Sequence, residues 1–386
     1  MLIVHTISYS ICILTSAYLS LITLIIIFIF HNHHFLMRRL LKSFVSTTHH
    51  CLLLHSSSYN HSKNVKFFLP NRLTWVRNMA TGRTVVGPTN KNKIVVVMGA
   101  TGSGKSKLSI DLATRFFPNS EIINSDKIQV SKGLDITTNK ISVSERRGVV
   151  HHLLGEFSSE FSPSDFRSVA SNRIADIGNR NKLPLIVGGS NSFIYGLLSN
   201  RFEPGFDVFD ESNPVQCVSK ELRYNCCFIW VDVLTPVLNQ YLYKRVDEMM
   251  KSGMYEELEE FFEKNGFSGS NSAGRHSGLR KAIGVPEMER YFEKYRNCTV
   301  EEKCRLYEEA AREIKENTRQ LAEKQIWKIK RLREAGWDLQ RVDATEAFTA
   351  AMMPENGKIP ATEVASIWEK QVVKPSVKIV KSFLLE

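Results

Sequence analysis

The chain has 386 residues, and its 51 Lys and Arg against 40 Asp and Glu give a formal net charge of +11. The excess lies in residues 1–92, which hold nine basic residues and no acidic one. From residue 93 onward 42 basic residues stand against 40 acidic ones, which excludes the strongly positive surface of a protein that wraps a long phosphate backbone. The seven cysteines form no C-x2-C pair, so a zinc finger is not expected. We expect the cysteines to be free thiols in a reducing compartment.

The N-terminal segment carries two distinct signals. Residues 11–30 are apolar or small and uncharged, and a stretch of that length can span a bilayer. Residues 37–92 are rich in Ser, Thr, His and basic residues, which is the composition of an organelle transit peptide. We therefore expect residues 1–92 to be a largely disordered targeting extension for a plastid. Mitochondrial targeting, a membrane anchor formed by residues 11–30, and a cytoplasmic protein remain as alternatives.

A phosphate-binding motif follows a predicted strand. Residues 93–98 are a β-branched apolar run, and apolar residues recur at helical spacing after residue 107. The stretch between them fits G-x-x-x-x-G-K-[ST] and reads Gly99, Ala100, Thr101, Gly102, Ser103, Gly104, Lys105 and Ser106. Glycines let the backbone turn so that several N–H groups meet one anion, and the helix start adds its positive dipole end. Lys105 adds a full charge, and the Ser106 hydroxyl can ligate Mg²⁺.

The chain then alternates strands and helices, which predicts a parallel sheet. Strands are expected at 120–126, 183–187 and 226–233, with a helix at 163–179. Because sites in such sheets lie at the carboxyl ends of the strands, we expect residues 99–106, Asp126, residues 188–191 and Asp232 to gather along one edge.

The second half is predicted to be helical. Residues 237–262 and 299–334 carry apolar stripes, the latter through Leu306, Ala310, Ile314 and Leu321. Residues 266–278 are predicted to be a mobile loop, and residues 341–386 a C-terminal tail without a clear motif. The fold class is thus α/β, a P-loop NTPase-like parallel sheet flanked by helices, with a C-terminal helical portion; the domain spans residues 93–340. We expect a monomer.

Further motifs stand in order along the chain. They are N-S-D-K-I-Q-V at 124–130, G-L-D-I-T-T-N-K at 133–140, H-H-L-L-G at 151–155, L-I-V-G-G-S-N-S at 185–192, R-V-D at 245–247, and N-T-R-Q-L-A-E-K-Q at 317–325. Together with the phosphate loop they resemble the isopentenyltransferase family, and within it the plant adenylate isopentenyltransferases of cytokinin biosynthesis. The resemblance covers roughly residues 93–335.

The resemblance implies alkyl transfer from dimethylallyl diphosphate to the N6 amine of AMP, ADP or ATP. The loop would hold the donor's diphosphate with Mg²⁺, the cofactor that the resemblance implies, and Asp126 would be the general base. Asp126 could instead cap a helix or ligate the metal. Ser190 and Arg245 resemble the family's contacts to the diphosphate. The alternatives are that Ser190 only forms a structural turn after the strand and that Arg245 is a solvated charge on a helix. Thr138 and Lys140 would line the acceptor pocket.

Five other residues also stand out in the sequence. Asp232 ends an apolar strand as a metal-binding aspartate would, although a structural cap fits equally well. His151 and His152 are expected to be a packed, hydrogen-bonded pair. The family has Tyr where Ser131 stands and Pro where Val150 stands, and both positions are expected near the acceptor pocket.

The acceptor is expected to be a free nucleotide, without nucleic acid as a partner. The tRNA-modifying relatives carry a helical insertion after the Gly-Gly strand end, and here residues 196–227 leave no room for one. A tRNA dimethylallyltransferase, a P-loop small-molecule kinase, and a membrane-anchored nucleotide-binding protein without catalysis remain as alternatives. Contact with a membrane is expected only through residues 11–30.

Overall fold

The computed structural model describes residues 92–267, 277–295, 298–353 and 359–386. The predicted targeting extension, including residues 11–30, lies outside these ranges except for residue 92, as does most of the loop predicted at 266–278. Within the described ranges no helix is both long enough and apolar enough to cross a membrane.

The core is a six-stranded sheet in which all paired strands run parallel. The strands are β1 (Lys93–Met98), β2 (Ser120–Asn124), β3 (His151–His152), β4 (Leu183–Gly188), β5 (Asn225–Asp232) and β6 (Leu339–Asp343), in the order β3-β2-β4-β1-β5-β6. β1 is central, so the phosphate loop that follows it emerges in the middle of the sheet edge. The predicted parallel sheet is confirmed, and β3 and β6 are strands that the sequence did not reveal.

Helices connect and cover the strands. They are α2 (Lys105–Arg115), α3 (Pro163–Asn179), α4 (Asn191–Leu198), α5 (Thr235–Met249), α6 (Tyr255–Asn265), α7 (Ser277–Arg280), α8 (Val285–Lys294), α9 (Val300–Glu334), α10 (Thr345–Ala351), α11 (Ala361–Trp368) and α12 (Lys374–Leu385), with short helical segments η1 (Val215–Cys217), η2 (Met250–Met254) and η6 (Glu369–Val373). The helix predicted at 163–179 is confirmed, and a capping box between Ser162 and Asp165 fixes its start.

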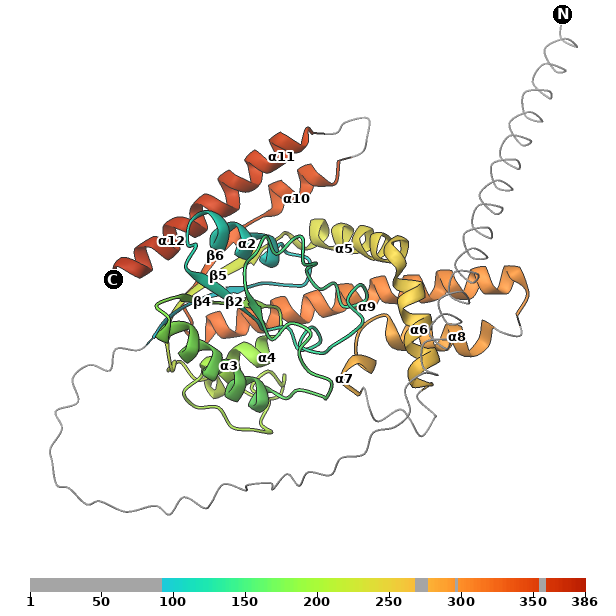
Figure 1. Cartoon of the computed structure of the whole chain (residues 1–386), viewed down its shortest axis with the longest axis horizontal. Coiled ribbons are helices and arrows are strands. Elements are labelled where there is room, and N and C mark those ends of the chain that lie inside the picture. Colours follow the sequence, from blue (N-terminus) through green and yellow to red (C-terminus); the bar gives the residue numbers. More distant parts are fainter. Residues whose placement is uncertain (1–91, 268–276, 296–297, 354–358) are drawn as a thin grey trace, which may run out of the picture. The chain divides into compact units, whose positions relative to one another are not determined.

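The sheet is buried on both faces, because side chains of β1 alternate between two apolar clusters. Ile94, Val96 and Met98 pack with α3, α4 and the end of α9. Val95 and Val97 pack with α2, α5 and the C-terminal helices. Figure 1 shows α3 and α4 on one side of the sheet and α11 and α12 on the other. Burial on both faces explains why the strands read as continuous apolar runs.

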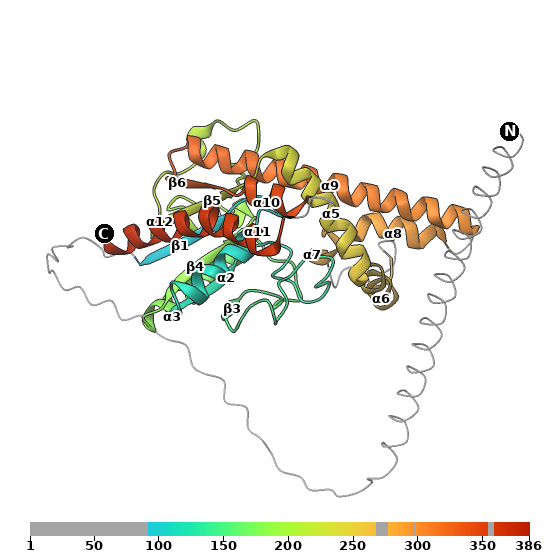
Figure 2. The ribbon, with the colours of Figure 1, turned by 90° about the horizontal axis from the view of Figure 1, so that it is seen from above.

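A third apolar cluster lies among the helices beside the sheet. It joins α6, α8 and the first half of α9, with Phe262, Phe292 and Ile314 buried in it. Figure 2 shows α8 alongside α9, at the end of that helix farther from the sheet, and α6 beside α8. The helix predicted at 237–262 is interrupted, because Gly253 takes the left-handed conformation with φ 104° between α5 and α6.

The stripe predicted along α9 is correct only in its first half. Ala310 and Ile314 are buried, but Leu321 is 38% exposed. The buried face continues instead through Thr318, Ala322, Gln325 and Ile329, at helical spacing from Ile314.

The C-terminal residues are not a tail. Residues 341–353 and 359–386 complete β6 and form α10 to α12, which cover one face of the sheet. Trp368, Val372, Val373 and Val380 are buried there at 5% exposure or less. This apolar face is what makes the segment fold onto the sheet.

Candidate active site

The phosphate loop is a tight turn from β1 into α2. Gly102 and Gly104 take φ of 77° and 91°, a conformation that only glycine adopts readily. A Cβ on Gly99 would lie 2.4 Å from the backbone carbonyl oxygen of Val231, so β5 approaches the loop too closely for any side chain. Gly104 caps the N-terminus of α2 without a side-chain hydrogen bond, so the first N–H groups of this helix remain available to a ligand held by the loop. This arrangement suits an anion.

Two cations converge on this loop. The Lys105 ammonium donates to the carbonyl oxygen of Ala100 at 2.6 Å, which leaves two of its three N–H donors for a ligand. Desolvation lowers the pKa of Lys105 to about 8. The nearby Asp126 carboxylate raises this pKa, and the charge of Arg245 lowers it by a smaller amount. Arg245 Nη2 donates to Thr101 Oγ1 at 2.9 Å. Arg245 thus reaches the loop and is not a solvated helix charge.

Asp126 follows β2 and lies close enough to Lys105 and Arg245 for its charge to act on both. Its Oδ1 accepts the backbone N–H groups of Ile128 at 3.0 Å and Gln129 at 3.3 Å. Oδ2 accepts no hydrogen bond from any described residue. The side chain therefore caps the following turn with one oxygen and keeps the other for a ligand.

Ser190 connects the ends of two strands. Its Oγ accepts the backbone N–H of Lys127 at 2.8 Å, so it fixes the turn that begins at Asp126, while its own hydroxyl hydrogen stays available. The strand ends are tightly packed here, because a Cβ on Gly188 would lie 2.5 Å from the backbone of Ser125. The expected gathering of residues 99–106, Asp126 and residues 188–191 at one sheet edge is confirmed.

Gln325 of α9 is a contact that sequence reasoning missed. Its Oε1 accepts the Thr101 N–H at 2.7 Å, and its backbone carbonyl accepts Asn191 Nδ2 at 3.1 Å. A Cβ on Gly189 would lie 2.7 Å from Gln325 Nε2. The residue closes the motif at 317–325, but nothing in its spacing showed that it bridges the phosphate loop and the end of β4.

Several buried polar atoms at this edge have no hydrogen-bond partner among the described residues. They are Ser103 Oγ in the loop, Ser125 Oγ beside Asp126, Asn191 Oδ1 at the start of α4, and Arg245 Nε. Native proteins satisfy nearly all buried polar atoms, so these four atoms are available to a polar ligand or to water at this edge.

The two predicted acceptor contacts, Thr138 and Lys140, hold their own loop. Thr138 Oγ1 donates to the carbonyl oxygen of Leu134 at 2.6 Å. Lys140 Nζ donates to the Gly133 carbonyl and to Asp135 at 2.8 Å, and the Lys140 side chain is only 4% exposed. Neither side chain makes a hydrogen bond or ion pair with the phosphate loop. Their loop lies next to the site through Gln129. The Gln129 backbone N–H is bound by Asp126, and its side-chain Nε2 donates to the Thr138 carbonyl at 3.0 Å.

Asp232 and the histidine pair have structural roles. Asp232 Oδ2 accepts Arg341 Nε at 2.6 Å, so this carboxylate forms an ion pair with β6. His151 Nδ1 lies 2.8 Å from the Val149 carbonyl oxygen, and His152 Nε2 lies 2.8 Å from Glu121 Oε2. The pair is therefore packed and hydrogen-bonded, as predicted.

The two departures from the family pattern differ in their surroundings. Ser131 is buried and its Oγ lies 3.5 Å from where a Gly278 Cβ would be. Val150 is 47% exposed, and its backbone carbonyl accepts the N–H of Ile122 from β2. The Val150 side chain consequently faces solvent, and only Ser131 lies in an enclosed position.

The donor set at the loop fits Mg²⁺. Ser106 is the second residue of α2, its side chain is exposed, and its hydroxyl forms no hydrogen bond within the described residues. Mg²⁺ keeps most of its waters and takes only one or two protein oxygens when it binds with a phosphate compound. One free hydroxyl beside an anion-binding loop meets that requirement.

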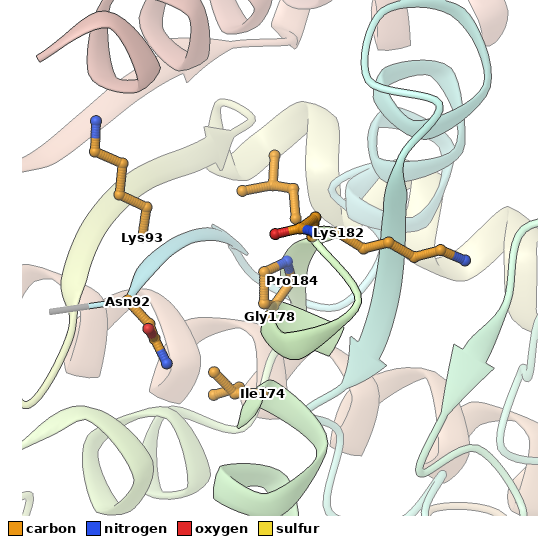
Figure 3. A pocket seen from close by; sticks show the side chains of 8 residues that line it. Asn92, Lys93, Ile174, Gly178, Lys182 and Pro184 are labelled. Atoms are coloured by element: carbon orange, nitrogen blue, oxygen red, sulfur yellow. The ribbon is translucent and has the colours of Figure 1, made fainter. Parts of the chain in front are cut away.

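A cavity of about 280 Å³ lies at the opposite edge of the sheet (Figure 3). Asn92, Lys93, Lys182 and Leu183 line it at the starts of β1 and β4. Its two lysines point away from each other in Figure 3 and are engaged elsewhere, Lys93 with backbone carbonyls of α12 and Lys182 with Glu121. The cavity thus offers no free charge to a ligand.

The fold and this edge together define a P-loop α/β protein whose phosphate-binding motif lies beside a carboxylate. The chain matches the model of the IPP transferase family over residues 129–213 and 206–331. It is 55% identical to an adenylate isopentenyltransferase of Humulus lupulus over 75% of this chain and 90% of that protein. The chain therefore belongs to the IPP transferase family.

Two further comparisons extend this result. The chain is 50% identical to the chloroplastic adenylate isopentenyltransferase 1 of Arabidopsis thaliana over 77% of this chain and 82% of that protein. Other similar Arabidopsis proteins are named chloroplastic, and one is named mitochondrial. Among solved structures, a eukaryotic dimethylallyltransferase acting on tRNA superposes with a TM-score of 0.57 at 25% identity, covering 76% of this chain and 79% of that one.

Proposed function

We propose that this protein is an adenylate isopentenyltransferase, which transfers a dimethylallyl group from dimethylallyl diphosphate to N6 of an adenine nucleotide in cytokinin biosynthesis. Relatives of that name match it at 50–55% identity over most of their length. The structural observation that carries the proposal is Asp126, a carboxylate with one free oxygen beside the phosphate loop.

In this mechanism the loop N–H groups, Lys105 and Arg245 hold the donor's diphosphate. A new bond forms between N6 and the allylic carbon while the bond from that carbon to the diphosphate oxygen breaks. The electron pair leaves with the diphosphate, whose growing charge these donors stabilise. Mg²⁺ held at Ser106 would add positive charge to the same leaving group.

Asp126 acts on the acceptor. An adenine amine is a poor nucleophile, and a carboxylate that accepts its N–H makes it a better one; general bases typically contribute about 10²–10⁴-fold. Oδ2 is the oxygen that takes the N6 proton, because Oδ1 is held by the following turn. That turn keeps the carboxylate aimed at the site during the reaction.

The acceptor is a free nucleotide. The connection from α4 to β5 consists of residues 199–224, and its helical content is the three-residue segment η1. A helical clamp for an anticodon loop does not fit in this connection, and the nearly neutral charge from residue 93 onward agrees.

Product analysis tests the proposal directly. The purified chain is incubated with dimethylallyl diphosphate, Mg²⁺ and AMP, ADP, ATP or unmodified tRNA, and each acceptor is analysed by mass spectrometry. We expect a dimethylallyl group on one or more free nucleotides. Product on tRNA alone, or ADP formed from ATP without the prenyl donor, would replace this function with a tRNA enzyme or a kinase.

The chloroplast is the proposed location, supported by the acid-free residues 1–92 and by the chloroplastic names of several relatives. A fluorescent protein fused after residue 92 should accumulate in plastids. Accumulation in mitochondria or at a membrane would favour one of the alternative locations.

A further inference from the structure

A buried tryptophan from the C-terminal segment lies along the first two turns of α2. Trp368 ends α11 and is 5% exposed. It contacts Gly104, Lys107 and Asp111, which are spaced by three and four residues and so share one face of α2. The indole therefore covers the helix from the phosphate loop to its second turn.

Each end of the indole makes a specific contact with α2. At one end, Trp368 Nε1 donates to Asp111 Oδ2 at 2.9 Å, and both groups are buried. Over its ring lies the Lys107 ammonium, 4.2 Å from the centroid, in a cation–π contact. At the other end, a Cβ on Gly104 would lie only 2.8 Å from the indole Cη2, so the ring touches the loop backbone.

The contact with Gly104 concerns the residue at which the phosphate loop turns into α2. Gly104 has φ 91° and caps α2, so a rotation there tilts the N–H groups that follow it. Phe348 of α10 supports the same point, 3.5 Å from the Cβ position of Gly104. At the far end of α2, Arg115 pairs with Glu369 at 2.8 Å. The C-terminal segment thus holds α2 at both ends.

We propose that Trp368 is a positioning residue for diphosphate binding. It is buried against Gly104 and α2, and it fixes both so that the loop N–H groups stay aimed at the donor's diphosphate. This inference rests on the proposed function for the identity of the anion, but the geometry requires only that the loop binds a diphosphate.

The test measures diphosphate binding separately from catalysis. Binding of inorganic diphosphate with Mg²⁺ is followed by calorimetry, and KM is determined for dimethylallyl diphosphate and for the nucleotide. We expect Trp368→Leu to raise the diphosphate Kd and the donor KM about tenfold or more, which corresponds to ~1.4 kcal/mol, with the nucleotide KM nearly unchanged. Trp368→Phe, which keeps a ring against Gly104, should restore most of the affinity.

Trp337 provides a matched control. It is 3% exposed, its Nε1 donates to the Ser219 carbonyl at 2.9 Å, and it packs in the cluster on the other face of the sheet. Trp337→Leu should lower the melting temperature comparably and leave diphosphate affinity within about twofold. Equal losses of affinity in both variants would reduce the effect to general destabilisation and overturn the proposal.

Two outcomes remain decisive if Trp368→Leu does not fold. Trp368→Met keeps the core filled but removes the aromatic ring from Gly104, so wild-type diphosphate affinity in a folded Trp368→Met variant would refute the positioning role. If the unaltered chain binds diphosphate but prenylates no acceptor, the proposed function fails while the comparison of Trp368 and Trp337 variants still stands.

Discussion

The strongest test of the mechanism is Asp126→Asn. The side-chain oxygen of Asn can accept the same two backbone N–H groups that Asp126 Oδ1 accepts, so the turn after β2 should persist and stability should change by less than about 1 kcal/mol. What the substitution removes is the basic oxygen. We expect kcat to fall about 10²–10⁴-fold, equivalent to ~3–5 kcal/mol in the barrier.

The effect on donor binding should be different. The Asp126 carboxylate offsets the positive charge of Lys105 and Arg245, and Asn removes that offset. The KM for dimethylallyl diphosphate should therefore stay the same or decrease. Steady-state kinetics with both substrates varied separates the two parameters, and thermal unfolding checks that the fold is intact.

Asp232→Asn is the matched control, because Asp232 also follows a strand at the same sheet edge but pairs with Arg341. It should lower stability slightly and leave kcat within about threefold, because it weakens an ion pair whose Arg341 side chain is 45% exposed. A folded Asp126→Asn enzyme with near wild-type kcat would remove Asp126 from the chemistry. A large loss in Asp232→Asn alone would move the essential carboxylate to β5.

Three further predictions follow from contacts around the site. Gln325→Met leaves the Thr101 N–H without its acceptor and should weaken diphosphate binding about fivefold, measured by calorimetry. Gly188→Ala places a methyl group 2.5 Å from backbone atoms and should cost about 1–3 kcal/mol in the free energy of unfolding, measured by urea titration. The hydrogen bond from Arg180 is the largest of the effects that hold the pKa of Glu121 well below its usual range. Ionised Glu121 therefore stabilises the fold above the ordinary pKa of a glutamate, and this contribution is lost as the pH falls toward the lowered pKa. Glu121→Gln should accordingly lower the melting temperature most at neutral pH and progressively less in acid.

The sequence predicted the elements whose signals are local. β1, the phosphate loop and the start of α2 follow one another directly, and the glycines that the motif requires take the positive φ that the turn needs. The place of Asp126 was predictable because it directly follows β2 in a parallel sheet. Its cap to Ile128 and Gln129 was one of the alternatives, and the structure shows this cap together with a free oxygen.

Elements that depend on distant partners were not predictable. β3 has two residues, and β6 buries only Leu339 and Val342, so neither gives a strand pattern. Trp368 bonds to a residue 257 positions earlier, and no spacing rule connects them. On α9 the buried face passes through Thr318, whose polarity concealed the continuation of the apolar stripe.

The placement of two carboxylates favours alkyl transfer over phosphoryl transfer in this fold. In P-loop enzymes that move a phosphoryl group, an aspartate after a neighbouring strand holds the metal beside the reacting phosphate. Here that position is Asp232, which Arg341 neutralises from β6. The carboxylate that forms no ion pair within the described residues is Asp126, which lies on the other side of the loop, where its charge acts on Lys105 and Arg245. A base beside a held diphosphate suits an enzyme in which the diphosphate leaves intact and the amine attacks carbon. In the mechanism we propose, the same loop geometry stabilises a leaving group, and Trp368 contributes by keeping the loop N–H groups aimed at the diphosphate.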